Sequence, residues 1–170
     1  FGALNLLLRE DMRDAFQMNG RSRRPPRDRF NAVLSFLYSM LMNDCRSAIE
    51  AAGLDPQVGF LHALRPGRAA LALDLMEEFR HLADRLALTL INRGQINADD
   101  FDHREGGAVM LEGDARKTVV TAWQERKQEQ ITHALLAQPV AIGLIPLVQA
   151  RLLARTLRGE TTDYPPYLTR

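Results

Sequence analysis

The sequence has only one cysteine, Cys45, in 170 residues, and it contains no long run of apolar residues. A single cysteine excludes a disulfide framework and fits a reducing cytoplasm. No apolar run approaches the roughly 18 to 20 residues that a membrane span requires, so we expect no membrane partner. An excess of one charge is missing too, because 22 Lys and Arg are balanced by 21 Asp and Glu. The net charge of +1 therefore says little about partners, although the arginines are clustered.

A signal peptide, an internal repeat and a strand-rich region are also missing. The first residues, FGALNLLLRE, already have a helical period and no initiating methionine, so we expect that the chain was cut from a longer protein. Length and composition predict one domain with a sizeable core. Apolar residues that recur at helical spacing predict an all-α fold, with a single multi-helix domain over residues 1–159 and an extended tail over residues 160–170.

The predicted helices are arranged around a central, largely buried one that runs from Asp28 to Ala52. Its apolar residues cover more than one face, but Asn31, Ser35 and Tyr38 form a polar stripe on it. Buried polar groups need partners, which either other side chains or a bound ligand could supply. The other helices are expected over residues 1–18, 70–92, 112–137 and 146–159, and a short hairpin or an irregular link is expected near residues 95–111.

Acidic residues gather along one flank of the helix predicted over residues 70–92, since positions three and four apart are neighbours on a helix surface. This flank carries Asp74, Glu77, Glu78 and His81. His62 lies far enough before the helix for the chain to reverse at the turn 65–68 and bring the imidazole to the same point. A mixed histidine and carboxylate site suits Mg²⁺ or Mn²⁺, and the imidazole favours Mn²⁺. The alternative is a solvated helix edge beside a hydrogen-bonded loop histidine.

A second group of possible ligands lies in the link and consists of Asp99, Asp100, Asp102 and His103. Its spacing is not that of a calcium loop, and the glycines that follow it are typical of a turn. These side chains are therefore expected to be caps and surface groups.

Arginines are concentrated in the segment RSRRPPRDR, residues 21–29, where two prolines forbid a helix. Guanidinium groups suit phosphate oxygens, so this loop predicts a nucleic-acid contact, with a solvated linker as the alternative. Arg151, Arg155 and Arg158 form a basic ridge on the last helix, which could follow a phosphate backbone or be an ordinary solvated face. In the proline-containing tail, Tyr164 and Tyr167 predict a docking peptide.

Several blocks of sequence occur together in an order typical of one known family. They are NAVLSFLY at 31–38, GLDPQVGFLH at 53–62, RPGRAALALDLMEEFR at 65–80, the pair Arg116-Lys117, and QARLLARTLRG at 149–159. Together they resemble the CRISPR-associated endonuclease and integrase of spacer acquisition, the Cas1 family. The resemblance covers essentially the whole chain, but only the helical carboxyl-terminal domain of that family, whose amino-terminal β domain is absent from this sequence.

The resemblance implies divalent-metal-dependent phosphodiester chemistry, in which the full-length enzyme joins the ends of captured double-stranded DNA to the CRISPR repeat. It also implies a homodimer that assembles with the small ferredoxin-like Cas2 in the cytoplasm of a prokaryote. His62, Asp74 and Glu77 match the family's catalytic metal-ligand positions, and Glu78 matches a possible second acid. The DNA-binding candidates are Arg24, Arg27, Asn31, Tyr38, Arg65, Arg68, Lys117 and Arg155.

A further ligand of the family, a glutamate, is expected to precede Phe1, because Phe1 matches the second member of a Tyr-Phe pair. The 170-residue chain alone is then expected to bind manganese weakly and to be nearly inactive. A different class of function is a non-catalytic helical DNA-binding or assembly module, in which the arginines act and the acidic edge is structural. A metal phosphohydrolase is a third class, but the adjacent His-Asp pair that it uses is missing.

Overall fold

The computed structural model describes residues 2–63 and 65–168, and the chain divides into two compact units. Unit 1 comprises residues 1–39 and 82–124, and unit 2 comprises residues 40–81 and 125–170. The divisions fall within α3 (Arg29–Ala51), α5 (Arg80–Asn92) and α6 (Gly113–Gln128), so these helices contribute to both units. Among the described residues, no helix combines the length and the apolar character needed to span a bilayer. The predictions made for Phe1 lie outside the described residues.

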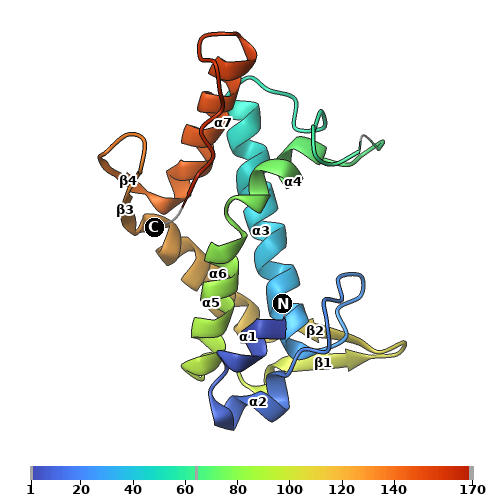
Figure 1. Ribbon diagram of the computed structural model, residues 1–170. Coiled ribbons are helices and arrows are strands. Elements are labelled where there is room, and N and C mark those ends of the chain that lie inside the picture. Colours follow the sequence, from blue (N-terminus) through green and yellow to red (C-terminus); the bar gives the residue numbers. More distant parts are fainter. Residues whose placement is uncertain (1, 64, 169–170) are drawn as a thin grey trace. The chain divides into compact units, whose positions relative to one another are not determined.

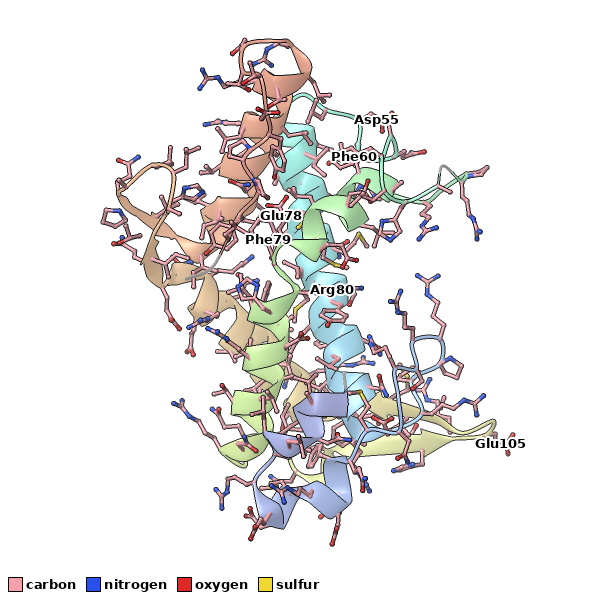
Figure 2. All side chains as sticks on the ribbon, in the orientation of Figure 1. Asp55, Phe60, Glu78, Phe79, Arg80 and Glu105 are labelled. Carbon is pink, nitrogen blue, oxygen red and sulfur yellow. The ribbon has the colours of Figure 1, made fainter. Side chains whose placement is uncertain are left out.

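Unit 1 combines helices with one β-hairpin (Figure 1). Besides its parts of α3, α5 and α6, it contains α1 (Gly2–Leu6), α2 (Glu10–Phe16), η1 (Ala98–Asp100), β1 (Phe101–Arg104) and β2 (Ala108–Leu111). The two strands pair antiparallel with Phe101 opposite Leu111, and Glu105 lies at the tip of the hairpin (Figure 2). Phe16 is fully buried and meets Phe101 edge to face, with 5.8 Å between the ring centroids. This aromatic pair joins the hairpin to the helical core.

Unit 2 is built around the second half of α3 and the tail that follows the last helix. Its elements are α4 (Ala70–Glu77), β3 (Gln130–Thr132), β4 (Pro139–Ala141), η2 (Ile142–Leu144) and α7 (Ile145–Leu157). After α7 the chain turns back and runs along that helix toward β3 (Figure 1). Leu41, Ile49, Phe79 and Ile145 are fully buried, and Tyr167 of the tail lies with its ring centroid 5.3 Å from that of Phe79. The tail is therefore part of the core of this unit.

The ends of α3 follow from the local sequence. Asp28 Oδ1 accepts the backbone N–H of Asn31 at 2.7 Å, so the predicted N-cap is confirmed. At the other end Gly53 has φ +78°, and the N–H of Leu54 donates to the carbonyl of Ile49 at 3.0 Å. This pattern is a Schellman motif, which requires a left-handed residue and therefore favours glycine.

The prediction of an all-α fold is wrong, because the described residues contain two antiparallel two-stranded sheets, β1–β2 and β3–β4. The first lies in the link near residues 95–111, and the second replaces the end of the helix predicted to continue to Ala137. His133 closes the turn between β3 and β4: its N–H donates to the carbonyl of Gln138 at 3.0 Å, and its Nδ1 accepts the N–H of Leu136 at 3.3 Å. Apolar spacing compatible with a helix did not reveal these turn contacts.

Two other predicted helices are interrupted. The helix expected over residues 1–18 is divided into α1 and α2, because the N–H of Arg9 donates to Asn92 Oδ1 at 3.0 Å instead of continuing the helix. The helix expected over residues 70–92 is divided into α4 and α5, and Figure 2 shows Glu78, Phe79 and Arg80 at the break. The N–H groups of Glu78 and Phe79 bond three residues back, which tightens the end of α4. The acidic flank predicted on one continuous helix therefore does not extend to His81.

The arginine-rich loop before α3 is held by the fully buried side chain of Asn31. Asn31 Nδ2 donates to the carbonyl of Gly20 at 2.8 Å and to Asp28 Oδ2 at 2.6 Å. Its Oδ1 accepts from Arg21 Nη1 at 2.6 Å and from the N–H of Ser22 at 3.2 Å. Both ends of one amide thus bind the loop to the helix.

We predict that Asn31→Ala lowers the free energy of unfolding by about 3 kcal/mol, because it leaves several part-buried donors and acceptors without their partner. Urea denaturation followed by circular dichroism measures the change. Ser47→Ala, at an exposed position of the same helix, is the matched control. Equal denaturation midpoints for the two variants would contradict the role assigned to Asn31.

Candidate metal and nucleic-acid site

Asp74 lies in α4, and its buried carboxylate faces the loop that precedes the helix. Its Oδ2 accepts the backbone N–H of Phe60 at 2.8 Å and that of Leu61 at 3.0 Å. Its Oδ1 accepts the N–H of His62 at 3.0 Å and lies 2.5 Å from Nδ1 of the same residue. One carboxylate therefore holds three successive backbone groups and one imidazole.

Gly59 makes this close approach possible. A Cβ added at position 59 would stand 2.7 Å from Asp74 Oδ2 and 2.8 Å from the carbonyl carbon of Ala70. Real Cβ atoms do not approach other atoms so closely, and the nearest atoms here belong to a buried carboxylate and to helix backbone. The loop can lie against α4 in this way only because residue 59 has no side chain.

The hydrogen bonds around Asp74 decide its charge and the orientation of His62. Burial alone would raise the pKa of Asp74, but the hydrogen bonds from Leu61, His62 and Phe60 outweigh it, so the pKa lies below its ordinary value. An ionised carboxylate can only accept, so His62 Nδ1 carries the hydrogen of their bond. In the neutral ring Nε2 then keeps a free lone pair, and the side chain is 27% exposed. The His62 imidazole is thus fixed at one nitrogen and accessible at the other.

A cavity of about 240 Å³ lies beside Asp74 within unit 2. Its lining is mostly apolar and combines the loop, α4, α7 and the tail: Phe60, Leu61, Leu71, Asp74, Leu75, Glu77, Glu78, Leu153, Tyr164 and Pro166. Glu77 is 37% exposed, and its Oε2 lies 2.9 Å from Arg80 Nη1. Glu77 is therefore an accessible carboxylate on the wall of this cavity, and it pairs with Arg80, three residues further along the chain.

Glu78, the predicted second acid, anchors the tail. Its carboxylate accepts the Tyr164 hydroxyl at 2.6 Å, the Tyr167 backbone N–H at 2.7 Å and Gln149 Nε2 at 3.1 Å. Burial, followed by the hydrogen bond to Glu78, raises the pKa of Tyr164, so this hydroxyl remains a donor at neutral pH. The two adjacent glutamates at the end of α4 therefore have different roles, because one faces an arginine and the other binds the tail.

His62, Asp74 and Glu77 are side chains of the types that bind a divalent ion. They do not converge on one point as a complete set of ligands would. Within residues 2–63 and 65–168, no three His, Cys, Asp or Glu side chains lie together so that they could hold a metal ion. Both oxygens of Asp74 are occupied by N–H donors, whereas His62 Nε2 and the Glu77 carboxylate are accessible. Histidine ligands of metals usually donate their other ring N–H to a carboxylate or carbonyl, and the pair His62–Asp74 has this arrangement.

The DNA-binding candidates of unit 1 differ in accessibility. Arg24 and Arg27 are exposed in the loop before α3, and Lys117 is exposed on α6, where it pairs with Asp114 at 2.8 Å. Asn31 is buried, and the buried Tyr38 donates its hydroxyl hydrogen to Asp84 Oδ1 at 2.6 Å. The polar stripe predicted on α3 thus has protein partners in this structure.

The remaining candidates belong to unit 2. Arg65 is exposed and Arg68 is half-buried in the turn before α4. Arg155 is exposed on α7 and its Nε lies 3.1 Å from Glu160 Oε2, while Arg158 bonds the other oxygen of the same carboxylate. The hydrogen bond from Arg158 lowers the pKa of Glu160, so the predicted basic ridge is partly neutralised by one glutamate.

The second acidic group of the sequence has structural partners, as predicted. Asp100 Oδ2 accepts the N–H of Asn97 at 2.7 Å and completes a capping box at η1. Asp102 pairs with Arg104 at 3.0 Å on β1.

Gln149 and Gly59 are important residues that the sequence did not reveal. Gln149 is fully buried on α7, and its Nε2 donates toward Glu78, the Tyr164 hydroxyl and the Pro165 carbonyl. The only signal was a polar residue at an apolar position of the last helix. Gly59 carried no signal beyond being a glycine in a loop, because the contact that requires it comes from α4.

Residues 1–125 match the protein family described as "CRISPR associated protein Cas1". The chain is 56% identical over 171 residues to CRISPR-associated endonuclease Cas1 1 of Moorella thermoacetica, a match that covers 100% of the chain and 50% of that protein. Among solved structures, a casposase bound to integration product aligns with a TM-score of 0.85 and 25% identity, covering 97% of this chain and 47% of that one. A chain of a Cas6-RT-Cas1–Cas2 complex aligns with a TM-score of 0.81 and 29% identity, covering 98% and 18%. The chain therefore spans about half the length of the curated relative.

We predict that Gly59→Ala destabilises the protein by about 2 kcal/mol, since overpacking forces either the loop or α4 to move. Thermal unfolding measured by calorimetry should show the loss, with Gln57→Ala at an exposed position of the same loop as the control. A Gly59→Ala protein as stable as the control would show that the loop does not lie against Asp74 as described.

Proposed function

Because the chain belongs to the Cas1 family of CRISPR-associated proteins, we propose that it is the helical, catalytic part of a divalent-metal-dependent DNA endonuclease and integrase. The proposed substrates are captured double-stranded DNA and the CRISPR repeat to which its 3′ ends are joined. The observation that carries the proposal is the His62 imidazole, held by Asp74 at Nδ1 and accessible at Nε2, on a chain that also presents the exposed Glu77. The name of the Moorella relative as an endonuclease supports the same class of reaction.

The proposed cofactor is Mn²⁺ or Mg²⁺, with His62 Nε2 and the Glu77 carboxylate as ligands. A bound divalent ion would polarise the scissile phosphate and offset charge on the departing oxygen. Asp74 would orient the imidazole and keep its lone pair on Nε2, which its bond to Nδ1 supports. That Asp74 is itself a ligand stays a prediction, and its occupied oxygens favour the orienting role. The glutamate expected before Phe1, and the weak activity expected of the 170-residue chain without it, also stay predictions.

Nucleic acid would be positioned through its phosphates by the accessible basic side chains, which we propose to be Arg24, Arg27, Arg65, Arg68, Lys117 and Arg155. Such contacts orient the DNA without reading its bases. Asn31 and Tyr38 would act indirectly, because they support the loop and helix that carry some of these cations. A homodimer and the ferredoxin-like Cas2 are the proposed protein partners, and a prokaryotic cytoplasm is the expected location. The complex named for the structural neighbour, Cas6-RT-Cas1–Cas2, supports the choice of Cas2.

A non-catalytic helical DNA-binding or assembly module is the second candidate function. Two observations favour it: Asp74 is saturated by hydrogen bonds, and Glu78 is occupied by the tail. In this case the acidic residues of α4 would serve only to hold the loop and the tail, and the arginines alone would meet DNA.

Manganese titration separates the two functions. We predict weak but measurable heats for the 170-residue chain, a loss of at least about tenfold in affinity for His62→Ala and Glu77→Gln, and a loss of similar order for Asp74→Asn. Glu50→Gln, which removes an exposed carboxylate on α3, is the control and should bind as the unchanged chain does. Equal affinity of all the variants, or no heat with any of them, would exclude the metal site and leave the assembly module.

DNA binding is predicted to depend steeply on salt, because the proposed contacts are to phosphates. The affinity for a labelled duplex, measured by fluorescence anisotropy, should fall linearly on logarithmic axes of binding constant and salt concentration. Arg24→Gln and Arg27→Gln should each reduce the slope by about 1. The control is Arg93→Gln, an exposed arginine outside the candidate set. A flat salt response would contradict both candidate functions.

A further inference from the structure

A second cavity, of about 220 Å³, lies within unit 1, and we call it the α3 pocket. Its floor is one face of α3, where Ala32, Ser35, Phe36 and Ser39 are spaced as neighbours on a helix. The remaining lining comes from the arginine-rich loop, from β2 and from α6: Arg23, Pro26, Val109, Met110, Leu111 and Arg116. No residue of the proposed metal site contributes to it.

The walls of the α3 pocket are connected by backbone hydrogen bonds. The N–H of Val109 in β2 donates to the carbonyl of Pro26 in the loop at 2.9 Å. The N–H of Arg27 donates to Ser22 Oγ at 2.9 Å, and Asn31 binds the same loop to α3. Loop, strand and helix are thus joined around the cavity, which favours a preformed site over one that opens on binding.

Two hydroxyl groups of the pocket can each form a further hydrogen bond, one as a donor and the other as an acceptor. Ser35 Oγ accepts from Nη1 and Nη2 of Arg21, at 3.2 Å each, so its own hydrogen remains available. Ser39 Oγ donates to the carbonyl of Phe36 at 2.7 Å, so its lone pairs remain available. A ligand edge that carries both an acceptor and a donor would match this pair.

The same pocket combines an aromatic ring with two cations. The guanidinium carbon of Arg116 lies 6.0 Å from the centroid of the Phe36 ring. Neither Arg23 nor Arg116 forms an ion pair with a carboxylate within the described part of the chain. An aromatic ring together with guanidinium groups that no carboxylate neutralises is a combination that binds a nucleobase and its phosphate.

We propose that the α3 pocket binds one unpaired nucleotide of DNA, with its base against Phe36 between Ser35 and Ser39 and its phosphate on Arg23 and Arg116. The volume of about 220 Å³ is below the roughly 300 to 1,000 Å³ of pockets for drug-sized ligands, so it suits a single base, with the phosphate outside on the exposed Arg23 and Arg116. A base that remains paired and stacked in a duplex cannot enter such a cavity, so the nucleotide must be unpaired. The proposal rests on the proposed function to the extent that it takes DNA as the substrate.

Fluorescence anisotropy with the 170-residue chain tests this proposal, using a labelled short oligothymidylate and a labelled duplex in parallel. Phe36→Leu keeps the apolar bulk and removes the aromatic face, and Arg116→Gln removes one exposed cation without touching the core. Each variant is expected to raise the Kd for oligothymidylate roughly tenfold, and Phe36→Leu should leave the Kd for the duplex unchanged. Arg93→Gln, an exposed arginine of unit 1 outside the pocket, should change the oligothymidylate Kd far less.

The outcomes separate the pocket from the wider function. If the unchanged chain binds both DNAs and the pocket variants bind oligothymidylate as Arg93→Gln does, the pocket proposal is overturned and the proposed function stands. If the unchanged chain binds neither DNA, both are overturned. If Arg116→Gln weakens oligothymidylate binding but Phe36→Leu does not, the site is only a phosphate contact, and the proposal that a base lies against Phe36 is overturned. Displacement of the oligothymidylate by a glutamate-rich peptide at equal concentration would assign the pocket to an acidic protein segment instead.

Discussion

The hydrogen bonds that converge on Asp74 are the interaction on which the rest of the site depends. A buried, ionised carboxylate is stable only when it is well paired, and here backbone N–H groups of Phe60, Leu61 and His62 pair it. The same bonds fix the loop on α4, which the missing side chain at Gly59 permits. Because Asp74 also accepts from the His62 imidazole, one carboxylate holds both the loop and the candidate ligand in place. Loss of this carboxylate would remove both.

The acids of α4 have different partners although they lie close together. Asp74, Glu77 and Glu78 lie within α4 or at its end, and all three line one cavity, as their spacing suggested. The break that follows accompanies a buried Phe79, and at it Glu78 binds the tail through Tyr164. The tail thereby covers one wall of the cavity beside Asp74. Of the two adjacent glutamates, Glu78 therefore anchors the tail while Glu77 pairs with Arg80 and is exposed.

Sequence periodicity predicted both ends of α3, and it missed two interruptions of the expected helices. The N-cap of α3 at Asp28 and its end at Gly53 lie within a few residues of their partners, so local signals sufficed. The break held by Arg9 depends on Asn92, which is 83 residues away and which spacing does not specify. The partners of His133 are as local as the caps of α3, but the helical spacing of the apolar residues did not indicate a turn there. In the site, the approach of His62 to Asp74 was predicted because a turn separates them. The use of both Asp74 oxygens by N–H donors was not, since residue spacing does not report backbone donors.

The orientation of His62 is tested most directly by nitrogen NMR of the histidine rings at a pH where they are neutral, followed by addition of a small amount of Mn²⁺. We predict that His62 carries its hydrogen on Nδ1, through the bond to Asp74, and that Mn²⁺ broadens the His62 signals before those of the exposed His103. A His62 ring protonated at Nε2, or broadening of both histidines at the same Mn²⁺ concentration, would contradict the view that Asp74 presents this imidazole to a metal ion.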